Sequence, residues 1–139
     1  TERRLRTDPP TAAEVAAATA DIDDAIRSSD VDVGAAASVV GVAGTCTNIA
    51  AYTLGLVEYE RERIHLATFG RDEVLASCVQ LLHASVERRR AIPFMHPGRA
   101  DVIGGGALIV ERLLAHVESS VPYVVSEHDV LDGIAWSLA

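Results

Sequence analysis

The fold of this chain is decided by the stretch Val39-Val40-Gly41-Val42-Ala43-Gly44-Thr45-Cys46-Thr47-Asn48. Residues 36–43 are apolar and small, and such a run next to a glycine turn predicts a buried strand. Gly44 and Thr45 then open a turn into a helix over roughly 47–54. The first amides of a helix have no intrahelical partner and lie at the positive end of its dipole, so this turn favours an anion such as phosphate.

The same turn also has an ordinary structural interpretation. Thr45 or Thr47 is able to cap the helix, which is a common use of threonine at a helix N-terminus. The stretch is not a Walker phosphate loop, because it lacks the GxxxxGK spacing and the chain contains no lysine. Phosphate contact and simple helix capping therefore both stay open at this point.

A second informative segment starts the long helix that the apolar pattern predicts over 99–118. Three glycines, Gly104, Gly105 and Gly106, lie in its first turns, and each lowers helix stability by about 1 kcal/mol relative to alanine. Close packing or close approach of a ligand has to compensate for them. Arg99 precedes them and is able to hold a phosphate in bidentate fashion or to form a salt bridge with Asp101.

The remaining pattern alternates strands with helices. Thr11 and Glu14 predict a capping box at the start of the first helix. The other predicted elements are a strand over 64–68, a helix over 71–85, a short helix after residue 86, a strand over 122–126 and a helix over 130–136. This order predicts an α/β domain with short, mostly parallel strands packed with helices.

Composition excludes several function classes. A chain of 139 residues that is 49% hydrophobic and 23% charged forms one folded domain. The net charge of −8 and the pI near 5.0 argue against nucleic-acid binding. Two cysteines and five scattered histidines make no metal motif, so we expect no metal ligand in this chain. No apolar run reaches the ~18 residues of a membrane span and no signal peptide is visible, so we expect a cytoplasmic protein without membrane contact.

Three segments together resemble the exopolyphosphatase/guanosine pentaphosphate phosphohydrolase family. They are Gly-Val-Ala-Gly-Thr at 41–45, His-Pro-Gly-Arg-Ala-Asp-Val-Ile at 96–103 with Gly-Ala-Leu-Ile at 106–109, and Val-Ser at 125–126 with Leu-Asp-Gly at 131–133. The opening Thr1-Glu2-Arg3 and the later Asp8-Pro9-Pro10 are similar to the stretch after the second phosphate loop of that family. The resemblance covers nearly the whole chain.

The resemblance implies a ribonuclease-H-like fold of the actin-like superfamily, in which two domains enclose a phosphate-binding cleft. It also implies Mg²⁺-dependent release of terminal phosphate from inorganic polyphosphate or guanosine pentaphosphate. The first domain with its catalytic carboxylate, and the Asp-x-Gly-Gly-Gly-Ser loop, have no counterpart here. We therefore expect residues 1–139 to be most of the second domain, without catalytic residues or bound metal and inactive alone.

Matched by position, the resemblance implies that Gly44 and Thr45 line the cleft and that Arg99 contacts the anion. These three residues are the substrate-binding candidates. The alternative function is a non-catalytic module that binds a phosphorylated ligand or dimerises. In either case a face that packs on a missing domain would expose apolar surface, so we expect a homodimer.

Overall fold

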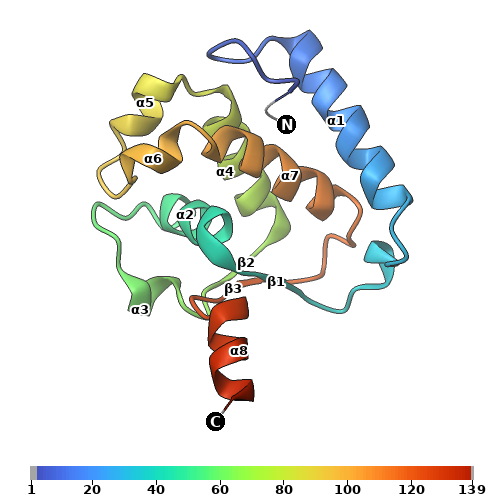
Figure 1. Ribbon diagram of the computed structural model, residues 1–139, viewed down its shortest axis with the longest axis vertical. Helices are drawn as coiled ribbons and strands as arrows, with labels where there is room; N and C mark the ends of the chain where they lie inside the picture. The colour runs from blue at the N-terminus through green and yellow to red at the C-terminus, as the bar shows by residue number, and fades with distance from the viewer. Residues whose placement is uncertain (1–2, 139) are drawn as a thin grey trace.

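The computed structural model of the chain describes residues 3–138, so the resemblance noted at Thr1 and Glu2 lies outside the described residues. Most of the helices lie on one side of a small sheet (Figure 1). The strands are β1 (Val39–Gly41), β2 (Thr68–Phe69) and β3 (Tyr123–Val125). The helices are α1 (Ala12–Arg27), the 3-10 turn η1 (Val33–Ala35), α2 (Ala43–Thr53), α3 (Arg61–Ile64), α4 (Arg71–His83), α5 (Val86–Arg90), α6 (Pro97–Ala100), α7 (Ile103–Ala115) and α8 (Val130–Ser137).

The sheet has the order β1-β3-β2 and is mixed. β1 runs parallel to β3, with Val40 opposite Val124, whereas β2 runs antiparallel to β3, with Phe69 opposite Tyr123. The α/β class is confirmed. We predicted mostly parallel strands, but only one of the two strand pairs, β1 with β3, is parallel. Parallel pairing needs a long crossover, and the chain from β1 to β3 supplies one through helices α2 to α7.

The strand predicted over 64–68 is two residues long and begins later. Ile64 ends the short helix α3 and is fully buried, and Leu66 adopts a left-handed conformation with φ 61°. The Leu66 amide donates to the Val125 carbonyl at 2.7 Å, so the chain joins the sheet edge through a turn before β2 starts at Thr68. An apolar pattern over five residues did not distinguish this turn from a strand.

The core lies between the sheet and helices α2, α4 and α7. Its largest fully buried side chains include Ile49, Leu81, Ile103 and Tyr123. Helix α1 begins at the predicted capping box and packs on α7, and its Ala18 forms a small cluster with Leu108 of α7 and Leu82 of α4. Helix α8 projects away from the rest of the molecule and has no buried residue (Figure 1).

The single helix predicted over 99–118 is wrong, because Asp101 and Val102 separate α6 from α7. Two glycines of α7 lie close to side chains of neighbouring helices. A β-carbon on Gly106 would lie 2.7 Å from Cγ2 of Thr45 in α2, and one on Gly104 would lie 2.9 Å from Nη1 of Arg89. Close packing therefore compensates for the low helix propensity of these two glycines.

Candidate functional site

The start of α2 carries the turn that the sequence singled out. The helix begins at Ala43, four residues before the predicted start, with Val42 as its N-cap. Thr45 and Thr47 lie inside the helix, so the interpretation of either threonine as the N-cap is wrong. Among the described residues no side chain caps this end, and the first-turn amides of Gly44 and Thr45 keep their hydrogen-bonding capacity.

The guanidinium of Arg99 lies directly against Gly44. A β-carbon built on Gly44 would overlap the guanidinium, so only glycine leaves room for the side chain in this position. The predicted alternative, a salt bridge between Arg99 and Asp101, is wrong. Asp101 accepts from Nη2 of Arg90 at 2.9 Å, and within residues 3–138 Arg99 has no carboxylate partner.

Gly44 and Arg99 share one pocket of about 310 Å³, which also contains Thr47, Asn48, Tyr59, Phe94 and His96. The structure thus brings together two of the three residues predicted to contact substrate. The side chain of the third, Thr45, lies against Gly106 on α7 and is not part of the pocket wall. Its amide stays in the first turn of α2, next to Gly44.

The pocket contains polar groups that the sequence did not single out. Asn48 is 5% exposed, and its Nδ2 donates to the Gly44 carbonyl at 2.7 Å, which fixes the peptide plane at the start of α2. His96 is the N-cap of α6, where its Nδ1 accepts from the Gly98 amide at 3.2 Å. Because Nδ1 accepts, the ring proton lies on Nε2 in the neutral form.

Tyr59 reaches the pocket from the loop before α3. Its hydroxyl is hydrogen-bonded to Glu127, which is not part of the pocket wall. Its hydroxyl donates to Oε1 of Glu127 at 2.7 Å, while Nε of Arg61 donates to Oε2 at 3.0 Å. Burial, and next the hydrogen bond to Glu127, raise the pKa of Tyr59. The phenol is therefore neutral at physiological pH. Glu127 lies 68 residues from Tyr59 in sequence, so no local pattern could have paired the two.

The charge of the pocket suits an anion. Arg99 brings a full positive charge, and no carboxylate is among the seven residues that form the wall. Among residues 3–138 no three His, Cys, Asp or Glu side chains come together in a way that could hold a metal ion. The donor set of the pocket does not fit Mg²⁺, because its wall contains no carboxylate. No helix in the described part of the chain is long and apolar enough to cross a membrane.

Comparison with known proteins shows the family of this chain. Residues 1–138 match the Ppx/GppA phosphatase family. This chain belongs to that family. Exopolyphosphatase 2 of Mycobacterium tuberculosis is 40% identical over an alignment of 146 residues that includes all of this chain and 45% of that protein. The resemblance seen in the sequence is confirmed.

Solved structures of Ppx/GppA proteins share the fold. An exopolyphosphatase-like protein with 36% identity superimposes with a TM-score of 0.93 over 99% of this chain and 46% of its own. A family member from Aquifex aeolicus, 23% identical, gives a TM-score of 0.83 over 99% of this chain and 44% of its own. The actin-like α/β fold is thereby shown. The chain spans less than half the length of these Ppx/GppA relatives.

Proposed function

We propose that this chain is most of the second actin-like domain of a phosphoanhydride hydrolase that releases terminal phosphate from inorganic polyphosphate or guanosine pentaphosphate. The observation that carries the proposal is the position of Arg99, free of a carboxylate partner within residues 3–138 and set against Gly44 at the uncapped start of α2. Membership of the Ppx/GppA family supports phosphatase chemistry. The M. tuberculosis relative is named an exopolyphosphatase.

In this proposal the pocket binds phosphate groups and neutralises their charge. The planar guanidinium of Arg99 donates to two phosphate oxygens, and the amides of Gly44 and Thr45 donate to the same chain of phosphates. Phosphoryl transfer depends chiefly on positioning and on charge stabilisation, so such contacts contribute directly to rate. Water attacks the terminal phosphorus and forms a new P–O bond, and the bridging P–O bond breaks. The shortened phosphate chain is the leaving group, the attacked phosphorus becomes orthophosphate, and the proton of the water passes to solvent.

We propose that the group that orients this water lies outside the pocket. None of the seven wall residues is a carboxylate, and the resemblance places the catalytic carboxylate in the first domain. We propose that the 139-residue chain alone binds the substrate without turning it over. Mg²⁺ is proposed as the cofactor of the complete enzyme, where it would neutralise phosphate charge; the residues of this pocket would not hold it.

The aromatic wall supports guanosine pentaphosphate as one of the two substrates. Tyr59, Phe94 and His96 place three rings beside Arg99, and a planar base stacks favourably on such surfaces. Inorganic polyphosphate has no group that uses these rings. Substitution of Phe94 by leucine should therefore weaken the binding of guanosine pentaphosphate and leave the binding of polyphosphate unchanged.

A homodimer and a cytoplasmic location stay predictions. The exposed apolar side chains of α8 support the first: Leu131 is 70% exposed and Trp136 is 67% exposed. Apolar patches of this kind promote association. Light scattering of the chain and of a Trp136→Ser variant tests it, because a monomer in both samples contradicts the dimer.

The experiment for the proposed function measures free phosphate. The full-length protein and the 139-residue chain are each incubated with Mg²⁺ and with long-chain polyphosphate or guanosine pentaphosphate. Release by the full-length protein alone supports the proposal. Binding without release by either protein would contradict it and favour the alternative, a non-catalytic phosphate-binding module.

A further inference from the structure

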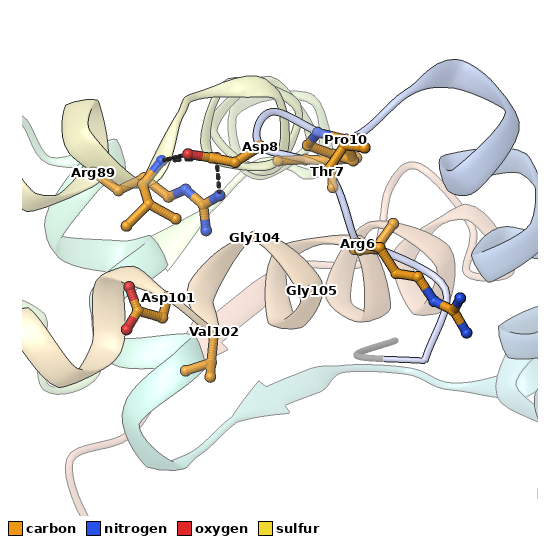
Figure 2. A pocket seen from close by; sticks show the side chains of 12 residues that line it. Arg6, Thr7, Asp8, Pro10, Arg89, Asp101, Val102, Gly104 and Gly105 are labelled. Atoms are coloured by element: carbon orange, nitrogen blue, oxygen red, sulfur yellow. Dashed lines mark hydrogen bonds and ion pairs between the residues drawn. The ribbon is translucent and has the colours of Figure 1, made fainter.

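Arg89 is a buried arginine whose guanidinium contacts three other parts of the chain. Its side chain is 6% exposed. Nε donates to the Ala84 carbonyl at 3.1 Å, Nη1 donates to the Ala100 carbonyl at 2.8 Å, and Nη2 lies 3.5 Å from the Asp8 carboxylate. Figure 2 shows Asp8 above α7 with its carboxylate directed at Arg89 and Gly104 below.

This arrangement is unusual because the buried charge of Arg89 has one carboxylate near it, that of Asp8, which is itself partly exposed. Asp8 is 44% exposed at its side chain, and its two oxygens also accept from the Val86 amide at 2.9 and 3.0 Å. Burial lowers the pKa of Arg89 more than Asp8 raises it. A buried ion pair is weak evidence for stability, since an apolar side chain of similar size often does as well. The contacts that Arg89 makes therefore suggest a second role.

That role concerns α6, the single turn that carries Arg99. Helices this short have little stability of their own and depend on contacts made from outside. His96 is the N-cap of α6, where its Nδ1 accepts from the Gly98 amide, and the bond from Arg89 fixes the carbonyl of the last residue of α6, Ala100. Arg90, the next residue of α5, adds an exposed ion pair to Asp101. Residue 99 thus lies immediately before the carbonyl that the buried guanidinium holds.

We propose that Arg89 is a positioning residue for Arg99: by holding the Ala100 carbonyl, it keeps α6 in the orientation that places the Arg99 guanidinium against Gly44. Gly104 leaves the space that Arg89 needs, since a β-carbon there would lie 2.9 Å from Nη1. The inference rests on the proposed function for its effect on substrate, and on geometry alone for its effect on Arg99.

The test uses two variants of the 139-residue chain and one matched control. Arg89→Lys keeps a positive charge but loses the planar group that reaches Ala84 and Ala100 together. Gly104→Ala keeps Arg89 and pushes its guanidinium aside. Arg88→Lys is the control, because Arg88 is exposed on the same helix and makes no side-chain hydrogen bond within residues 3–138. Circular dichroism confirms that each variant is folded.

Two measurements distinguish a positioning role of Arg89 from a general loss of folded structure. The first is the Nε–Hε signal of Arg99 in a nitrogen-15 NMR spectrum, identified by its loss in Arg99→Lys. It should shift in Arg89→Lys and Gly104→Ala and stay in place in Arg88→Lys. The second is the Kd for inorganic polyphosphate from titration calorimetry, which should rise about 10-fold in both test variants and not in the control.

A double-substitution cycle completes the test. If Arg89 acts through Arg99, Arg89→Lys should change the Kd by less than twofold when Arg99 is already lysine. An unmoved Arg99 signal in folded variants, or a full 10-fold effect in the Arg99→Lys background, overturns the inference. Absence of polyphosphate binding by the unaltered chain contradicts the proposed function instead, and the NMR readout then decides the positioning role by itself.

Discussion

The guanidinium of Arg99 occupies the space that a β-carbon on Gly44 would need. One residue belongs to the first turn of α2 and the other to the single turn of α6, and no carboxylate within residues 3–138 neutralises the arginine. A glycine and an unpaired arginine in contact at an uncapped helix start form a surface that suits phosphate oxygens.

Replacement of Gly44 by alanine should displace Arg99 without unfolding the chain. Alanine is the better helix former, so α2 stays intact, whereas the added methyl group moves the guanidinium. A hydrogen bond to a charged group contributes about 1.5–3 kcal/mol, so polyphosphate affinity should fall by roughly 10- to 100-fold. Titration calorimetry measures this loss. Gly133→Ala is the control, because no atom lies within 4 Å of a β-carbon there. Equal affinity of the two variants would count against the Gly44–Arg99 site.

Ala43 should tolerate glycine better than other helical alanines do. Its φ of 63° is left-handed, a conformation that costs a non-glycine residue about 1–2 kcal/mol. Glycine relieves that strain but loses about 0.5–1 kcal/mol through its greater freedom in the unfolded chain. Urea unfolding should show unchanged or slightly raised stability for Ala43→Gly. The exposed Ala25→Gly in α1 should lose about 1 kcal/mol. A similar loss in both variants would show that the turn is not strained.

Because of Glu14, the free energy of unfolding should decrease as the pH falls through the acidic range. Hydrogen bonds from Thr7 first, and then from the Thr11 amide, lower its pKa from 4.5 to about 2. Because the folded pKa lies below the unfolded one, this stabilisation is complete above about pH 4.5 and is lost as the pH falls toward 2. Denaturant midpoints measured from pH 6 to pH 2 should decline less steeply in Glu14→Gln. Glu118→Gln, an exposed residue, should keep the slope of the unaltered chain, and identical slopes in both variants would contradict this account.

Cys78 should be inert in the folded protein. Burial above all raises its pKa from 9.0 to about 12, which lowers the thiolate fraction at neutral pH about 1,000-fold. In a Cys46→Ser variant, Cys78 is the remaining thiol, and it should react with a disulfide reagent only after urea is added. Rapid reaction of the folded variant would show that the helix α4 face is open to solvent.

The sequence predicted those parts of the molecule that local patterns determine. The capping box at Thr11 and Glu14, the helix over 71–85 and the α/β class depend on neighbouring residues, and all three are present. The helix predicted over 99–118 is interrupted at Asp101 and Val102, directly after the Ala100 carbonyl that accepts from Nη1 of Arg89. Arg89 lies on another helix, so no local pattern could have shown this contact.

Some residues of the candidate site could be predicted from the sequence and others could not. Gly44 and Arg99 could be named from motifs, and the structure brings them into one pocket. Tyr59 could not, because it takes its place through a hydrogen bond to Glu127 that only the folded chain creates. The pairing of Asp101 with Arg90 was missed for a similar reason: the bend between α6 and α7 turns Asp101 toward α5.

The anion site at Gly44 and Arg99 is tested by the affinity of the 139-residue chain for inorganic polyphosphate, compared between the unaltered chain, Arg99→Gln and Arg88→Gln. Both substitutions remove one exposed positive charge, so a non-specific attraction to a polyanion would be reduced equally. The account predicts binding by the unaltered chain, a 10-fold or greater loss in Arg99→Gln and little change in Arg88→Gln. Equal affinities for the two variants would contradict an anion site at Gly44 and Arg99.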